Sequence, residues 1–231
     1  MRRGSIGPVL RLGLACIAAL ALPGCIRLEQ KLMLNGDGSM AMSFHYSVAA
    51  DSAGLLATGA GVIQGWPDHA PKSDAWFTSE DAVRKRFEGT GVRLQQYRSY
   101  VDGGRQHVEL QLFAEAGPAA LNAGLFGPFR CARLPNGRVR LWAELPPVAS
   151  KADGLSPEAL TALAQDLYLS LEVTVPGEIV DTTARTHERS SVRWEFDPTK
   201  DASFLRSPPR LACTFEAKQL EWAARLPTAV P

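Results

Sequence analysis

Apolar and polar side chains alternate along most of the chain after residue 25, and this two-residue period is typical of strands that bury one face. Three pairs of alternating segments are separated by short turns that contain glycine: residues 26–34 with 40–48, 92–101 with 106–114, and 129–134 with 138–145. The last of these turns contains Asn136-Gly137, a dipeptide that favours the positive φ angles of tight hairpin turns. Each pair therefore predicts a β-hairpin.

Three single strands and several short helices complete the pattern. Further strands are predicted at residues 167–175, 192–196 and 211–215. Thr78 is the expected N-cap of a helix that has Glu80 and Asp81 in its first turn and ends at Gly89. Other helical segments are predicted at residues 118–123, 156–166 and 218–226, whereas residues 49–76 predict a weak helix followed by a loop.

The order of these elements predicts the fold class. Hairpins and helices recur along the chain, and the connections are too short for parallel crossovers. We therefore predict an α+β fold with a mostly antiparallel β-sheet built from repeated hairpins and a few short helices packed on one face. The domain is expected to span residues 25–217 and to be large enough for a sizeable core, and residues 218–231 are expected to form a short C-terminal tail or helix.

The first 24 residues have the layout of an export signal. Arg2, Arg3 and Arg11 precede an apolar stretch at residues 12–22, which is too short to span a bilayer. The stretch ends in Leu-Pro-Gly before Cys25, and this resembles the lipobox of bacterial lipoproteins, although proline is an uncommon residue there. We therefore predict that residues 1–24 are a cleaved signal peptide.

The lipobox resemblance implies that Cys25 becomes the first residue and carries a diacylglyceryl group on its sulfur and a further acyl chain, such as palmitate, on its amino group. Two or three chains make a stable membrane anchor, whereas a single chain does not. The alternative is a plain secretory signal in which Cys25 is incidental. Because Ile26, and not aspartate, follows Cys25, the sorting pattern of lipoproteins implies the periplasmic face of the outer membrane if the envelope has two membranes.

Export to an oxidising compartment changes the meaning of the remaining cysteines. Cys16 leaves with the signal and Cys25 is used by the lipid, so Cys131 and Cys213 form the remaining pair. A disulfide between them is one interpretation. The other is that both are small buried hydrophobic residues that do not meet.

Charge and motifs exclude several function classes. The chain has 25 Lys plus Arg and 24 Asp plus Glu, so it lacks the basic excess that a nucleic-acid binder needs. The four histidines and the cysteines lack the spacing of metal ligands, so no metal is expected. The Gly-rich turn that begins at Asn35 lacks the bidentate glutamate of a calcium loop. No nucleophile elbow, P-loop or dinucleotide fingerprint is present, and no cofactor is expected.

Acidic and aromatic side chains supply the remaining candidates. Glu172, Glu178 and Glu195 are placed on predicted strands as candidate acid and base of a glycosidase, although solvent-facing acids are the simpler interpretation. Trp66 and Trp76 lie in the irregular segment and are the better candidates for an exposed ligand surface. The strand residues Trp142 and Trp194 are expected in the core.

Three segments of the chain carry a family resemblance: residues 28–39, 77–92 and 171–196. In the first, a strand and an acidic Gly-rich turn follow Cys25 directly, and in the last a strand ends in Pro176-Gly177 before a strand that contains Trp194. These features resemble the mycobacterial lipoprotein-M-like (DUF3153) bacterial lipoproteins. The resemblance implies an envelope lipoprotein with no assigned catalytic residues.

The expected function is therefore that of a membrane-anchored, non-enzymatic binding or structural module in the cell envelope. Its partner is expected to be an envelope protein or an amphiphilic glycolipid. The alternative is an envelope hydrolase that acts on cell-wall polysaccharide through carboxylates whose pairing the sequence does not reveal.

Overall fold

The computed structural model describes residues 27–50, 77, 79–145, 167–197, 200–205, 207 and 210–228. The signal peptide, Cys25, most of the irregular segment with Trp66 and Trp76, and the helix predicted at residues 156–166 lie outside these residues. No helix within the described ranges is long and apolar enough to cross a membrane.

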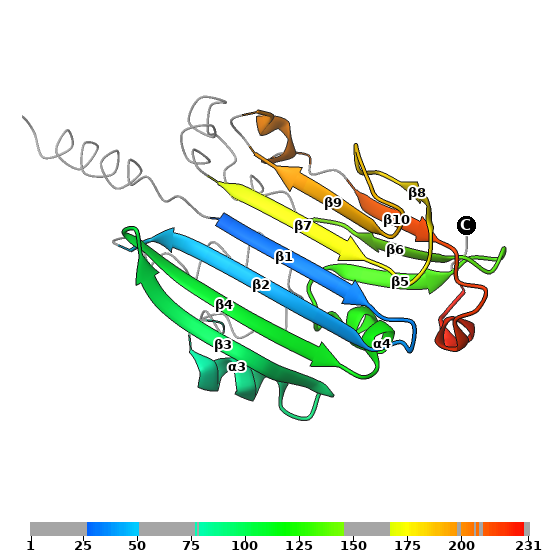
Figure 1. Cartoon of the computed structure of the whole chain (residues 1–231), viewed down its shortest axis with the longest axis horizontal. Helices are drawn as coiled ribbons and strands as arrows, with labels where there is room; N and C mark the ends of the chain where they lie inside the picture. Colours follow the sequence, from blue (N-terminus) through cyan, green and yellow to red (C-terminus); the bar gives the residue numbers. More distant parts are fainter. Residues whose placement is uncertain are drawn as a thin grey trace, which may run out of the picture.

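The described residues form two β-sheets (Figure 1). The larger sheet has six strands in the order β3-β4-β2-β1-β7-β9: β1 (Arg27–Leu34), β2 (Met40–Ala49), β3 (Val92–Asp102), β4 (Arg105–Ala114), β7 (Tyr168–Thr174) and β9 (Ser191–Phe196). The smaller sheet has four strands in the order β5-β6-β10-β8: β5 (Phe129–Arg133), β6 (Val139–Ala143), β8 (Ile179–Thr182) and β10 (Leu211–Phe215).

Strand pairing confirms the mostly antiparallel architecture, but the prediction of a single sheet was wrong, because the strands divide into two sheets, and one strand pair is parallel. The three predicted pairs are present as β1–β2, β3–β4 and β5–β6, each antiparallel. However, β1 and β7 pair in parallel, with Arg27 opposite Tyr168 and Met33 opposite Thr174. The expectation that parallel pairs are absent was wrong because the chain builds β2 to β6 between β1 and β7, which leaves ample length for a crossover.

The buried face of the larger sheet follows from the alternation in the sequence. On β1, Leu28, Leu32 and Leu34 are buried, and one hydrophobic core joins them to residues of both sheets. Gln30 is a buried polar side chain on the same face, only 3% exposed, and its amide donates a hydrogen bond of 3.1 Å to the carbonyl oxygen of Phe126. This bond stabilises the contact between the central strand and the loop before β5.

Two short helices contact the sheets. In α3 (Glu80–Phe87), Val83 and Phe87 are buried and the helix packs against β3. Its N-cap is Ser79, whose hydroxyl accepts a hydrogen bond of 3.2 Å from the backbone N–H of Ala82, so the prediction of Thr78 as the cap was wrong by one residue. Helix α4 (Gly117–Asn122) lies at the predicted helical turn and contacts β2, β4 and β5.

The C-terminal segment packs on the first hairpin. This segment follows β10 and contains the short 3₁₀ helix η5 (Glu221–Arg225). Another 3₁₀ helix, η4 (Ala202–Leu205), precedes β10. Trp222 of η5 is buried, and its indole N–H donates a hydrogen bond of 3.1 Å to the carbonyl oxygen of Gly36. Gly38 has a φ of 86°, and a Cβ there would lie 3.0 Å from the Trp222 ring. The turn between β1 and β2 therefore needs glycine beside this indole.

Gly177→Ala is expected to destabilise the protein, because a Cβ on Gly177 would collide with the backbone oxygen of Glu216. Backbone shifts of this kind cost about 1–3 kcal/mol, and urea unfolding will measure the loss. Gly36→Ala is the matched control, since no atom lies within 4 Å of a Cβ there. Equal stability of the two variants would contradict the close approach.

Candidate functional site: the open face of the six-stranded sheet

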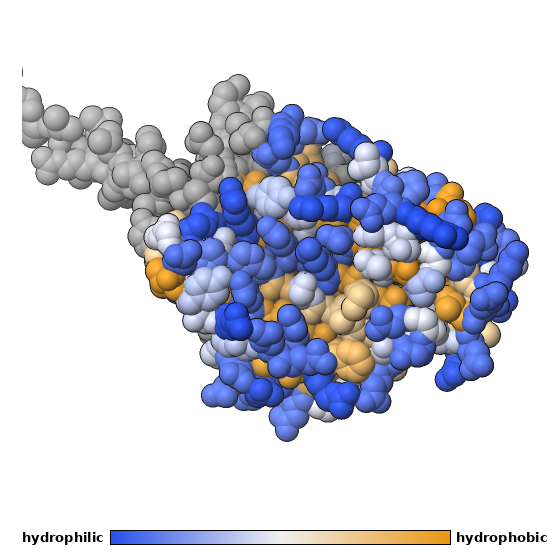
Figure 2. All heavy atoms as spheres, in the orientation of Figure 1, coloured by the Kyte–Doolittle hydropathy of each residue, from blue (hydrophilic) through white to orange (hydrophobic). Residues whose placement is uncertain are grey.

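One face of the six-stranded sheet is not covered by the second sheet or by α3 and α4. Figure 2 views this face and shows mostly hydrophilic residues with hydrophobic areas among them. The alternate residues of each strand that are not in the core lie here, and we call this surface the open face. Side chains from all six strands of the larger sheet gather on it.

Two histidines meet on the open face. The Nε2 of His45 on β2 and the Nδ1 of His107 on β4 lie 3.1 Å apart, so one ring donates a hydrogen bond to the other. Their rings stack at 5.4 Å between centroids, and Tyr100 of β3 stacks on His107 at 4.9 Å. The Tyr100 hydroxyl donates a bond of 2.8 Å to Glu109, and this bond raises the pKa of Tyr100. The cluster offers aromatic faces and hydrogen-bonding groups side by side.

A second polar cluster lies across β7 and β9. Arg193 forms an ion pair of 2.8 Å with Glu195 and donates a bond of 3.0 Å to the Ser170 hydroxyl. The Tyr168 hydroxyl donates to the same carboxylate at 3.0 Å and accepts from Arg193 at 3.1 Å. Because each group satisfies another, this cluster is a network held in place on the sheet.

The candidate glycosidase carboxylates are ion-paired. Glu172 pairs with Lys31 at 3.5 Å, and Glu195 pairs with Arg193 on the same face. Glu178 precedes β8 instead of lying on a strand, so its predicted placement was wrong, and it pairs with Arg189 at 3.6 Å. All three are solvent-accessible, and Glu178 does not belong to the open face with the other two.

An apolar strip lies at the end of the open face where β1 ends. Met33, Ala41 and Phe113 occupy one register row across β1, β2 and β4. Met33 is 47% exposed, and the guanidinium of Arg93 lies 5.6 Å from the centre of the Phe113 ring. We call Met33, Ala41 and Phe113 the apolar strip. Figure 2 shows hydrophobic colour in the lower centre of this face.

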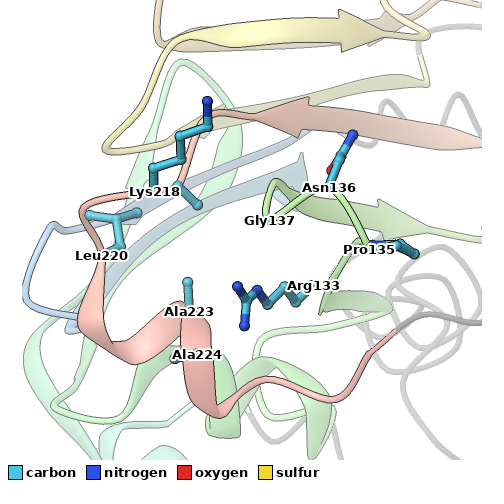
Figure 3. A pocket seen from close by; sticks show the side chains of 9 residues that line it. Arg133, Pro135, Asn136, Gly137, Lys218, Leu220, Ala223 and Ala224 are labelled. Carbon is cyan, nitrogen blue, oxygen red and sulfur yellow. The ribbon is translucent and has the colours of Figure 1, made fainter.

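A small pocket lies away from the open face, between the β5–β6 turn and the C-terminal segment. It has a volume of about 330 Å³, and Figure 3 shows Arg133 directed towards Ala223 and Ala224, whereas Lys218 points away from them. Its lining residues are Arg133, Pro135, Asn136, Gly137, Ala217, Lys218, Leu220, Ala223 and Ala224. The lining lacks methionine and aromatic side chains, so it is not the apolar concavity that a lipid chain needs.

The two candidate disulfide cysteines are free thiols. Cys131 on β5 and Cys213 on β10 both lie opposite Leu141 of β6, so a whole strand separates them. Neighbouring strands lie about 4.8 Å apart, which places the two Cα atoms roughly 10 Å apart, beyond the ~7 Å limit for a disulfide. The structure therefore agrees with the interpretation that both cysteines are buried and do not meet, and not with a disulfide.

The other predicted site residues are only partly described. Cys25, Trp66 and Trp76 lie outside the described residues. Trp194 is buried as predicted, but Trp142 is only half-buried because it lies on the face of β6 that points away from the core. In the part of the chain that the structure describes, no three His, Cys, Asp or Glu side chains are placed to hold a metal ion. The pair of histidines was missed because its members are 62 positions apart.

Comparisons with known proteins give a structural likeness. No family model and no curated protein matches the chain, so the DUF3153 resemblance stays a prediction. Among solved structures, the chain is similar to the NMR structure of the folded domain of LppM from Mycobacterium tuberculosis, with 12% identity and a TM-score of 0.44. The match covers 83% of this chain and 90% of that one. A likeness at this level carries no argument about function.

Cys131 and Cys213 are expected to resist thiol reagents in the folded protein. Burial raises the pKa of each thiol to about 12, so at pH 8 only about one molecule in 10⁴ is a thiolate. Mass spectrometry after alkylation should show no adduct on either residue in buffer and adducts on both in urea, with or without prior reduction. Rapid labelling in buffer would contradict the burial, and labelling that requires reduction would contradict the free thiols.

Proposed function

We propose that the protein is a bacterial envelope lipoprotein, anchored by acyl chains on Cys25, and that its domain is a non-enzymatic module that binds a partner on the open face. The observation that carries this proposal is the start of β1 at Arg27, two residues after Cys25. The lipobox therefore leads directly into the central strand of the sheet. An extended chain of two residues spans only about 7 Å, so this anchor would hold the sheet at the membrane surface.

The sequence supports the site of anchoring. The basic and apolar signal and the Leu-Pro-Gly-Cys motif favour acylation at Cys25, and in an envelope with two membranes Ile26 favours the periplasmic face of the outer one. A protein held in this way meets partners of the envelope and not of the cytoplasm.

A protein partner fits the open face better than a glycolipid does. The face is broad and carries polar networks beside the apolar strip. Methionine and phenylalanine in the strip, and Arg93 stacked on it, are residue types enriched at the centre of protein interfaces. An amphiphilic glycolipid would instead need an apolar concavity for its chains, and the pocket beside Arg133 has a polar lining.

The alternative of an envelope hydrolase has little support in the described residues. Glu172 and Glu195 lie on an open surface with a cationic partner each, whereas a glycosidase acid needs an environment that keeps it protonated. His45 and Glu109 lie on the same open surface, on β2 and β4.

Cys25→Ser is expected to prevent acylation. Intact mass of the wild-type protein from its own envelope should show cleavage before Cys25 plus the mass of the acyl chains, and the protein should pellet with membranes. The variant should stay uncleaved or become soluble. A wild-type protein that is cleaved, unacylated and soluble would contradict the lipoprotein proposal.

A photo-crosslinking residue at Met33 is expected to capture a protein partner in intact cells, because Met33 is exposed in the apolar strip. The matched control is Val180, which is 40% exposed on β8 of the other sheet. Protein adducts specific to position 33 that disappear when Phe113 is changed to Asp would support the open face as the binding surface. Lipid-sized adducts would favour the glycolipid, and identical adducts from both positions would contradict a specific face.

A further inference from the structure

We propose that the tip of the β3–β4 hairpin contacts the membrane that holds Cys25. This inference rests on the proposed acyl anchor and adds a second contact with the same lipid surface. The hairpin tip is defined here as residues 99–105, at the turn between β3 and β4. Figure 1 shows this turn at the end of the sheet where β1 begins.

The strand register places the tip level with the anchor. Arg27 at the start of β1 pairs with Ser47, and β2 continues for two more residues to Ala49, which pairs with Arg105 beside the turn. Two residues of strand advance about 7 Å. Cys25 precedes Arg27 by two residues and reaches at most about the same distance. An extended chain from Arg27 back to Cys25 would therefore reach the level of the hairpin tip.

The tip exposes two large side chains, of which Tyr100 also packs against His107 of the open face. Val101 is 63% exposed and Tyr100 is 39% exposed, although both are large hydrophobic residues. They lie on opposite faces of β3, because Tyr100 stacks on His107 of the open face and Val101 is the next residue along the strand. Figure 2 shows hydrophobic colour at this end of the sheet.

The chemistry of the tip fits a lipid headgroup region. Tyrosine is enriched at membrane interfaces, and the Tyr100 ring adds apolar surface beside Val101, while its hydroxyl is bonded to Glu109. Gly103 and Gly104 make the turn with φ angles of 54° and 73° and add no side chains that would hold the strand ends away from a surface. Arg27 is exposed at the same end, and the Arg105 guanidinium, bound to the backbone oxygen of Ser47 at 3.0 Å, lies along this edge. Arg27 is the cation that complements lipid phosphates, because Arg105 is bonded to Ser47 and the tip also carries the exposed carboxylate of Asp102.

A membrane is a better binding partner for the tip than a protein, because the proposed anchor keeps the bilayer beside it. Acyl chains on Cys25 keep the bilayer within reach at all times, whereas another protein would have to compete with it for the same few side chains. A single valine and a tyrosine also expose far less area than a stable protein interface needs, which is about 800 Å² per partner.

The test uses the acylated protein with an environment-sensitive dye on V101C, reconstituted in phosphatidylethanolamine and phosphatidylglycerol vesicles that contain spin-labelled lipid. The matched control is V180C, an exposed valine on β8 of the other sheet. Cys131 and Cys213 are buried and should not take the dye. S99C, which lies on β3 two residues further from the turn, gives a graded third position.

The dye at position 101 should emit at shorter wavelength and be quenched several-fold more strongly by the spin-labelled lipid than the dye at 180, with position 99 between them. Equal quenching at 101 and 180 in protein that carries the acyl mass and floats with the vesicles would overturn this inference and leave the anchor intact. A blue-shifted dye at 101 that lipid does not quench would indicate a protein contact and would also overturn it. Absence of acyl mass and of flotation would overturn both proposals.

Discussion

The architecture depends on the pairing of β1 with a strand on each side. Its antiparallel partner β2 follows directly in the chain, but its parallel partner β7 begins at Tyr168, after both helices and the first two strands of the second sheet. The pairing also fixes the register of the buried face. A slip by one residue would place Glu29 and Lys31 in the core in exchange for Leu28, Gln30 and Leu32, and this cost makes the observed register strongly preferred.

Local pairing was predictable from the sequence, and long-range pairing was not. The alternation around Asn136-Gly137 predicts both strands and the turn of the β5–β6 hairpin, because the dipeptide and the two-residue period are local signals. The split into two sheets and the parallel β1–β7 pair depend on which strands meet, and strands of similar alternation do not specify their partners. Strand β8 was missed because Ile179 is its only buried residue, so it shows no alternation.

The candidate site follows the same division. Alternation places His45 on the polar face of β2 and predicts burial of Cys131 and Cys213. It does not reveal that His45 lies against His107, because β2 pairs with β4 and leaves β3 at the edge. Nor does it reveal that Leu141 separates the two cysteines. In both cases a strand that comes from elsewhere in the chain decides which side chains are neighbours.

Strand β1 connects the proposed anchor to the open face, because it begins two residues after Cys25 and carries Met33 of the apolar strip. Contacts at Cys25 and at the β3–β4 tip would hold the sheet at two points along the same end of its strands. The strands would then run away from the membrane, and the open face would stand roughly perpendicular to the bilayer. Met33 lies six positions after Arg27 on β1, and six steps along a strand place the apolar strip about 20 Å further from the bilayer. The clusters around His107 and Arg193 would then lie between the headgroups and the strip. Because no flexible linker separates the anchor from the domain, the domain cannot reorient freely. A partner would therefore need a binding surface at the matching distance from the bilayer and in the matching orientation, as well as matching chemistry.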